Sequence, residues 1–102
     1  MKRSRLPLTA LRTFEAAGRL QSFTRAAGEL HISQAAVSRQ VRELELLLGQ
    51  ALFARGHRTV SLTASGASLL ATLTPAFDSI ALSLDLVTRS REPRSVSVSA
   101  EP

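Results

Sequence analysis

The sequence predicts a mainly α-helical fold: a winged helix-turn-helix of three helices plus a β-hairpin wing, followed by a long dimerisation helix. Three observations predict it. Apolar residues recur at helical spacing in three short segments before residue 49, two β-prone runs flank a Gly-His pair near residue 56, and an apolar seam follows through 64–90. The chain has 102 residues, 44% of them hydrophobic, so it can bury one small core.

The first two helices are predicted over about 8–18 and 23–30. Pro7 suits a helix start and Gly18 a helix stop. Every third position between these two residues is apolar: Leu8, Leu11, Phe14 and Ala17. Ser22 is an N-cap candidate for the second helix, because its hydroxyl can accept a hydrogen bond from the first turn.

The third helix is predicted over 34–48, with Ser33 as its N-cap and Gly49 at its end. Only three residues separate it from the second helix, which is the spacing of a helix-turn-helix. The tightest position of the turn favours a positive φ. His31 is expected there, since histidine is among the non-glycine residues enriched in that conformation.

The third helix has an unusual outer face. At about 100° per residue, one side collects an apolar set, namely Val37, Val41, Leu44 and Leu48. The far side collects small residues, a hydroxyl and arginines, namely Ala35, Ser38, Arg39 and Arg42. An ordinary surface helix would carry glutamates and lysines there, so this face is either a solvated surface or a surface made to fit an anionic partner.

Two short β-prone runs, 52–55 and 58–62, flank Gly56 and His57. Runs of this kind around a Gly-X pair predict a β-hairpin. A hairpin directly after a helix-turn-helix is a wing. Arg55 and Arg58 flank its turn, where they either contact nucleic acid or form a charged edge that prevents strand aggregation.

A last helix is predicted from about Ala64 to Ser90, capped by Thr63. Its seam alternates in steps of four and three: Gly66, Leu70, Leu73, Phe77, Ile80, Leu84 and Val87. Such a helix is roughly 39 Å long, at 1.5 Å per residue, which the small front domain cannot cover. The seam therefore predicts a homodimer, and a helix folded back on its own domain is the alternative. Pro75 interrupts the helix and predicts a kink without a full break.

The charge is concentrated in the first part of the chain. Residues 1–60 hold ten of the 13 Lys and Arg and four of the eight acids, so this part is +6 while the whole chain is +5. A basic first part is typical of a polyphosphate binder, or simply of a soluble surface. The absence of cysteine excludes disulfides and thiol catalysis and argues against a zinc site.

Other function classes find little support. Catalysis would need a nucleophile with a base, a metal cluster or paired carboxylates, and the two histidines and eight scattered acids offer none of these, so we expect no enzyme, no cofactor and no metal. The sequence shows no signal peptide and no run of about 18 uninterrupted apolar residues. We therefore expect a cytoplasmic protein with no membrane partner.

Two consecutive stretches resemble the N-terminal DNA-binding region of LysR-type transcriptional regulators: SFTRAAGELHISQAAVSRQVRELE and LGQALFARGHRTVSLTASG. The resemblance covers about residues 6–91, and the opening LPLTALRTFEAA is most similar to the branch that regulates β-lactamase and glycine-cleavage genes. It implies a DNA-binding domain over 6–63, a linker and dimerisation helix over 64–91, and at 92–102 the start of a missing effector-binding domain. A small-molecule effector would act only through that missing domain.

The resemblance also implies a homodimer on a dyad-symmetric promoter site in double-stranded DNA. Base reading is implied for Gln34, Ala35, Ser38 and Arg39, and minor-groove contact for Arg58, with Arg55 near the backbone. The residues themselves make Arg42 and the helix start at Thr24 and Arg25 phosphate candidates. The expected DNA-binding set is Thr24, Arg25, Ser33, Gln34, Ala35, Ser38, Arg39, Arg42, Arg55 and Arg58, and the expected dimer set is Leu70, Leu73, Phe77, Ile80, Leu84 and Val87.

Two alternatives remain at this point: an architectural protein that binds DNA with little sequence preference, and a helix-turn-helix used for protein contact. An architectural protein would rely on lysine for phosphate neutralisation, whereas this chain has one lysine and twelve arginines. Arginine is the residue suited to bidentate recognition of base edges. The sequence therefore favours the sequence-specific regulator.

Overall fold

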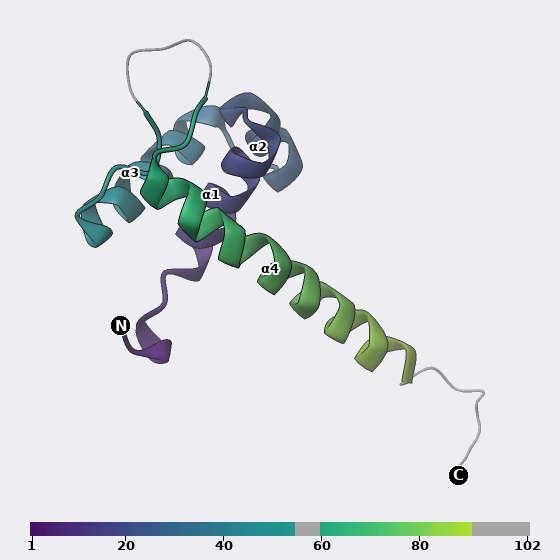
Figure 1. Cartoon of the computed structure of the whole chain (residues 1–102). Helices are drawn as coiled ribbons and strands as arrows, with labels where there is room; N and C mark the ends of the chain where they lie inside the picture. Colours follow the sequence, from purple (N-terminus) through teal and green to yellow (C-terminus); the bar gives the residue numbers. More distant parts are fainter. Residues whose placement is uncertain (55–59, 91–102) are drawn as a thin grey trace.

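The computed structural model describes residues 1–54 and 60–90. A short 3-10 helix, η1 (Arg3–Arg5), precedes four α-helices: α1 (Leu8–Leu20), α2 (Phe23–Leu30), α3 (Gln34–Leu48) and α4 (Ala64–Ser90). The first three α-helices form a bundle, and α4 packs on α1 and projects away from it (Figure 1). The mainly helical fold is confirmed, and all four α-helices begin where the sequence predicts.

Local caps fix the helix ends. The Ser22 hydroxyl accepts a hydrogen bond from the Arg25 N–H at 3.0 Å, and the Ser33 hydroxyl accepts one from Ala36 at the same distance. His31 has φ of 58°, as predicted for the turn. The prediction for the end of α1 is wrong: the helix continues past Gly18 to Leu20, and Gln21 takes the left-handed conformation.

Gly18 and Gly66 have a packing role instead. A Cβ on Gly18 would lie 3.2 Å from a Leu70 methyl carbon, and a Cβ on Gly66 would lie 2.1 Å from the Leu52 carbonyl oxygen. Both glycines let the start of α4 approach α1 and the segment after α3. The physical reason for the wrong stop at Gly18 is therefore a tertiary contact, which a local stop signal does not reveal.

The core lies between α1, α2 and α3 and is closed by the residues after α3. Phe14, Val37, Leu44 and Leu52 are almost completely buried. The Phe53 ring lies 5.4 Å from the Phe14 ring and 5.3 Å from a third ring, that of Phe23. The Phe14 and Phe53 rings are tilted by 56°, and the Phe23 and Phe53 rings meet edge to face at 71°, contacts that add to the free energy gained by burying the rings.

The segment after α3 returns toward α4 through one antiparallel bridge between Phe53 and Leu62. The Ala54 N–H donates to the Ser61 carbonyl at 2.8 Å, and the Thr63 N–H donates to the Leu52 carbonyl at 3.0 Å. Within residues 1–54 and 60–90 no longer strand is present. The predicted hairpin turn at Gly56 and His57 lies outside the described residues.

Helix α4 has two unlike halves. Its first half is capped as predicted, with the Gly66 N–H donating to the Thr63 hydroxyl at 3.0 Å, and it packs on α1. Every residue from Asp78 to Ser90 is exposed. The helix is continuous through Pro75, as the unbroken seam predicts.

By length and composition, α4 would suffice to cross a membrane: its best 18-residue window has a mean hydropathy of 1.4 and is 6% buried. A search for uninterrupted apolar runs misses this helix, because serines and threonines interrupt its apolar residues. The mean hydropathy of the segment is nevertheless high. Length and composition alone are weak support for a membrane span, since other long apolar helices satisfy the same requirement.

Candidate nucleic-acid interface

The outer face of α3 is open along its length. Gln34, Ala35, Ser38, Arg39 and Arg42 are all exposed. The opposite side is anchored by Val37, Val41 and Leu44, which are at most 3% exposed. The structure thus has the predicted arrangement, with apolar residues on the inner side of α3 and small or basic residues on its outer side. Leu48 is the exception, because this residue at the end of α3 is 38% exposed.

A polar contact that the sequence pattern did not indicate fixes α3 against α1. The Thr13 hydroxyl, which is completely buried, donates to Oε1 of Gln40 at 2.5 Å. Gln40 follows Arg39 directly in the chain, so this bond helps to fix the rotation of the helix about its own axis. Neither the residues around Thr13 in α1 nor those around Gln40 in α3 indicate that these two side chains meet.

Glu45 fixes the segment after α3 in a similar way. The residue is 7% exposed, and its carboxylate accepts hydrogen bonds from the backbone N–H groups of Leu52 at 2.8 Å and Phe53 at 3.3 Å. Bonds from N–H groups to an ionised carboxylate are among the stronger hydrogen bonds in proteins. The start of the predicted wing is therefore held to the helix that carries the outer face.

The start of α2 lies beside the start of α3. Thr24 and Arg25 are exposed in the first turn of α2, and the Thr24 hydroxyl donates to Oε1 of Gln34 at 3.1 Å. The first N–H groups of a helix have no partner within the helix and carry partial positive charge, so they attract anions. Ser33 shares the surface, and its hydroxyl oxygen is the cap of α3. Arg55 and Arg58 lie outside the described residues.

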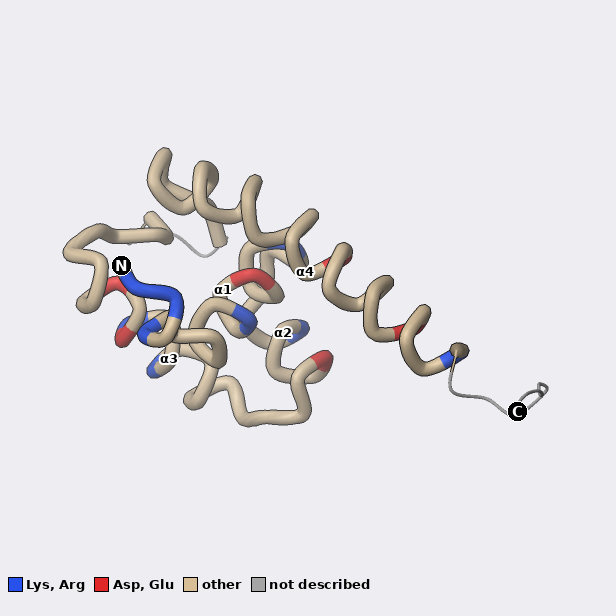
Figure 2. Tube along the Cα trace, turned by 90° about the horizontal axis from the view of Figure 1, so that it is seen from below, with Lys and Arg blue, Asp and Glu red and all other residues tan. Residues whose placement is uncertain are grey.

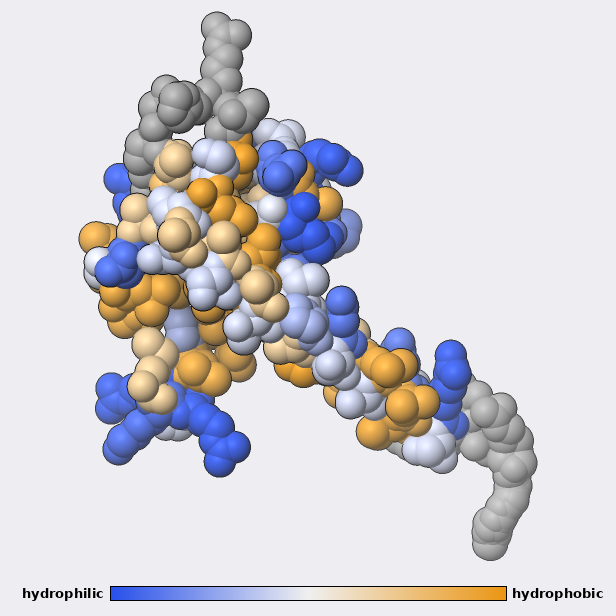
Figure 3. Space-filling view, in the orientation of Figure 1, coloured by the Kyte–Doolittle hydropathy of each residue, from blue (hydrophilic) through white to orange (hydrophobic). Residues whose placement is uncertain are grey.

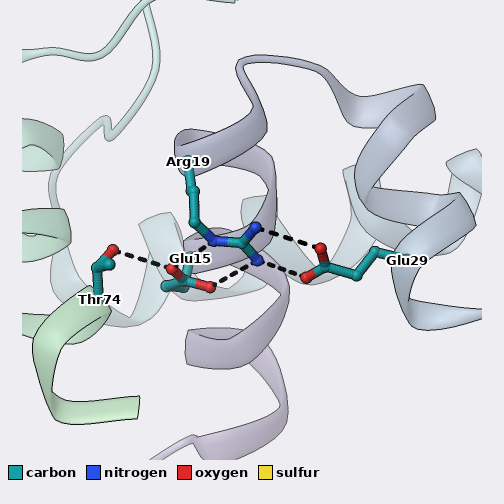
Figure 4. A network of polar contacts seen from close by, with 4 residues as sticks. All are labelled: Glu15, Arg19, Glu29 and Thr74. Carbon is teal, nitrogen blue, oxygen red and sulfur yellow. Dashed lines mark hydrogen bonds and ion pairs between the residues drawn. The ribbon is translucent and has the colours of Figure 1, made fainter. Parts of the chain in front are cut away.

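Arg19 is a basic residue that this surface does not use. Its guanidinium bonds Glu15 at 2.9 Å and also pairs with Glu29, while the Thr74 hydroxyl donates to Glu15 at 2.9 Å (Figure 4). These hydrogen bonds raise the pKa of Arg19 and lower the pKa of Glu29. The network joins α1 to α2 and α4, and only the i, i+4 spacing of Glu15 and Arg19 is visible in the sequence.

Charge separates along the molecule. Lys and Arg lie on η1 and on the three-helix bundle, whereas the described part of α4 carries Asp78 and Asp85 and, in its last turn, Arg89 (Figure 2). No group of three or more His, Asp or Glu able to hold a metal occurs among the described residues.

The predicted dimer seam is divided by the structure. Leu73 is 8% exposed and belongs to the core, and Leu70 and Phe77 pack partly against it. Leu73 thus corrects the prediction, because it has little surface left for a second copy. Ile80, Leu84 and Val87 are 52–61% exposed, and apolar surface gathers on the outer part of α4 (Figure 3).

Comparison with known proteins gives consistent results. Residues 8–67 match the family model described as "Bacterial regulatory helix-turn-helix protein, lysR family". The chain is 58% identical over 81 residues to the HTH-type transcriptional activator AmpR of Pseudomonas aeruginosa, covering 79% of this chain and 27% of that protein. It is 53% identical over 83 residues to the carbapenem-hydrolyzing beta-lactamase transcriptional activator of Enterobacter cloacae, covering 81% and 28%. The chain thus spans just over a quarter of these relatives.

Two solved structures with a similar fold are described as DNA complexes. The BenM_DBD/catB site 1 DNA complex has a TM-score of 0.77 at 33% identity and covers 86% of this chain and 98% of that one. The CbnR_DBD–DNA complex has a TM-score of 0.69 at 30% identity, covering 85% and 100%. The relatives are named as activators, which agrees with the expectation that the chain is not an enzyme. The matched residues include all of α1, α2 and α3, and the chain belongs to the LysR family of bacterial regulatory helix-turn-helix proteins.

Proposed function

We propose that this chain is the DNA-binding part of a LysR-type transcription regulator and that the outer face of α3 reads base edges in the major groove of promoter DNA. The observation that carries the proposal is the exposed set Gln34, Ala35, Ser38 and Arg39 on a helix anchored from below by buried side chains. The major groove of B-DNA is wide enough to admit an α-helix. Similar structures described as DNA complexes support the same reading.

Each residue of this face has a role that its chemistry supports. Arg39 can donate to O6 and N7 of one guanine, a contact that discriminates against other bases by about 1–3 kcal/mol. Ala35 is small enough to let the helix approach a thymine methyl group, and Ser38 can bond a base or a phosphate. Arg42, one turn further along, and Arg25 at the start of α2 can bind phosphates.

The rest of the predicted DNA contact belongs to the wing. Arg55 and Arg58 flank the proposed hairpin turn, and an arginine at a wing tip can enter a narrow A·T-rich minor groove. The hydrogen bonds between Glu45 and the start of this segment support a wing held in fixed relation to α3. The proposed DNA-binding domain comprises residues 6–63.

We further propose that residues 64–91 form a dimerisation helix, so that two copies bind a dyad-symmetric site. Ile80, Leu84 and Val87 support it, because large apolar side chains with more than half of their surface exposed need a cover. A second copy of α4 supplies a matching seam. This proposal gives α4 a soluble, cytoplasmic setting rather than a membrane. Residues 92–102 would begin an effector-binding domain that senses a small molecule.

An architectural protein with little sequence preference is the competing function. It would neutralise phosphates without reading bases, and its affinity would then depend on salt rather than on sequence. The outer face of α3 disfavours it, because alanines and a serine contribute nothing to phosphate neutralisation and leave base edges accessible.

Selection of bound sequences from random duplex DNA tests the function. We expect one enriched motif with two related half-sites. Arg39→Ala should reduce the difference in binding free energy between cognate and random DNA by about 1–3 kcal/mol, and so lower the ratio of the two affinities. Arg89→Ala, in the last turn of α4, is the matched control and should leave that ratio unchanged. Equal weakening of cognate and random DNA by Arg39→Ala would contradict base reading by this residue, and a flat selection would contradict sequence specificity altogether.

A further inference from the structure

We propose that Thr24 is a specificity-determining residue that acts by orienting Gln34, so that Gln34 reads keto bases, guanine or thymine, in preference to adenine or cytosine. The inference deepens the proposed function and rests on it. It concerns one hydrogen bond on the candidate interface, between the Thr24 hydroxyl of α2 and Oε1 of Gln34 at the start of α3.

The turn between α2 and α3 brings these two side chains together. His31 at φ of 58° reverses the chain, and the Ile32 N–H donates to the Ala27 carbonyl at 3.1 Å. Thr24 then lies 3.1 Å from the Gln34 amide oxygen although the two residues are ten positions apart. Both residues are exposed, so they share the surface that faces DNA in the proposed complex.

The position of Thr24 favours the amide oxygen over the amino group. Thr24 lies in the first turn of α2, where N–H groups without helical partners create partial positive charge. The Ser22 cap accepts from the Arg25 N–H, which leaves the positive end of the dipole near Thr24. A carbonyl oxygen is attracted to this charge and an amino group is repelled by it.

The orientation decides what Gln34 can offer a base. A glutamine that reads adenine uses its oxygen for the N6 amino group and its nitrogen for N7. When the oxygen faces Thr24, the amide nitrogen lies on the opposite side of the group, so the side chain presents its Nε2 protons away from Thr24. Guanine offers two acceptors, O6 and N7, and thymine offers O4, whereas adenine offers N7 alone beside an amino group and cytosine offers only an amino group.

The same bond changes the role expected for Thr24. A hydroxyl has one proton, and a phosphate oxygen can only accept. Since Thr24 donates that proton to Gln34, its side chain cannot also donate to a phosphate. The predicted phosphate contact of Thr24 is thereby limited to its backbone N–H, and the side chain acts through Gln34.

The experiment compares sequences selected from random duplex DNA by the whole chain and four variants. Gln34→Ala identifies the base position that Gln34 reads, as the position whose preference is lost. At that position the unchanged chain should favour guanine or thymine by about fivefold or more. Thr24→Val, which keeps the shape and removes the proton, should abolish this bias and admit adenine. Thr24→Ser keeps the hydroxyl and should restore the bias. Gln34→Glu presents only acceptors and should shift the preference to cytosine or adenine.

The possible results distinguish a failure of the Thr24 proposal from a failure of the proposed DNA-binding function. A preference for adenine by the unchanged chain, or the same base bias in Thr24→Val, would overturn the orientation by Thr24 while the remaining motif still supports the regulator. A selection with no preference at any position would overturn both. Thermal unfolding of Thr24→Val and Thr24→Ser, followed by circular dichroism, shows that each variant is folded and that a lost bias reflects recognition.

Discussion

Glu45 lies on the inner side of α3, where its carboxylate accepts hydrogen bonds from the N–H groups of Leu52 and Phe53. Backbone N–H groups buried without a partner are costly, and these two residues are almost fully buried. One side chain therefore satisfies two donors at the point where the chain leaves the helix.

Replacing this carboxylate should cost stability. Glu45→Ala is expected to lower the free energy of unfolding by about 3 kcal/mol, because two charge-assisted bonds are lost and two donors stay buried. Glu45→Gln keeps one acceptor oxygen and should cost about half as much. Urea unfolding measures both variants. A loss below about 0.5 kcal/mol for Glu45→Ala would show that the backbone finds other partners.

Two glycines provide a matched pair for stability. In Gly66→Ala the new Cβ would lie 2.1 Å from the Leu52 carbonyl oxygen, so backbone must move, and we expect a loss of about 2–3 kcal/mol. Gly28→Ala is the control: it lies within α2, no heavy atom lies within 4 Å, and alanine should stabilise the helix by up to about 1 kcal/mol. Thermal unfolding of both variants checks the opposite signs.

The ion pair of Arg19 with Glu29 predicts a weak acid dependence. The guanidinium lowers the pKa of Glu29 from its ordinary value of 4.5, so the folded state holds the proton less tightly than the unfolded state. The pair therefore stabilises the fold fully above about pH 4.5, and this contribution is lost as the pH falls through the lowered pKa.

Both side chains of this pair are more than one-third exposed, so solvent screens the interaction to less than about 1 kcal/mol. Glu29→Gln should lower the Tm by no more than about 5 °C at pH 7, and by progressively less as the pH falls from 4.5 toward 3. Melting curves between pH 3 and 7 test this, with Glu43→Gln as the control for losing one exposed acid of α3. A deficit that persists unchanged at pH 3 would contradict the assignment.

At the scale of elements, the helix starts were predictable because their signals are local. Ser22, Ser33 and Thr63 each accept a hydrogen bond from an N–H three residues ahead, and this geometry depends on the cap and its own first turn alone. Gly18 was misread because the same residue type serves both a helix end and a close helix crossing. The choice depends on Leu70, which lies 52 positions away and cannot be inferred from the neighbouring residues.

The candidate interface was predictable to a similar extent. Periodicity alone placed Ser38 and Arg39 outside and Val37 inside, because one helix with one buried side leaves little choice. The bonds from Thr13 to Gln40 and from Thr24 to Gln34 join different helices. Nothing in the spacing of residues on either helix marks these side chains as partners.

Helix α4 was expected to pair along its whole seam, yet the first half of the seam packs on the core and only its outer half is exposed. The proposed dimer contact therefore concerns Ile80, Leu84 and Val87. The double variant Ile80→Glu and Leu84→Glu should sediment as a monomer and bind operator DNA weakly, with the domain itself still folded. Leu73→Ala is the contrasting variant: it should lower the unfolding free energy by about 2–3 kcal/mol and leave the association state intact. Dimers that persist in the double variant would exclude this contact.

At the scale of the whole molecule, the candidate DNA-reading surface and the open half of α4 belong to different ends. The bundle carries α3, and α4 leads away from it to the exposed apolar residues (Figure 1). The network of Glu15, Arg19, Glu29 and Thr74 joins the bundle to the base of α4. The direction in which α4 leaves the bundle would set the distance between two bound half-sites.

The last thirteen residues of α4 are all exposed and project away from the bundle (Figure 1), and helical segments of that length are only marginally stable in water without a partner. In the proposed dimer, helix formation in this segment would therefore be coupled to the association of two chains. Dilution would then unfold the end of α4 in each chain, and the magnitude of the ellipticity per residue at 222 nm would decrease. In the proposed dimer, the spacer between the two DNA-binding domains would therefore become rigid only at chain concentrations high enough for association.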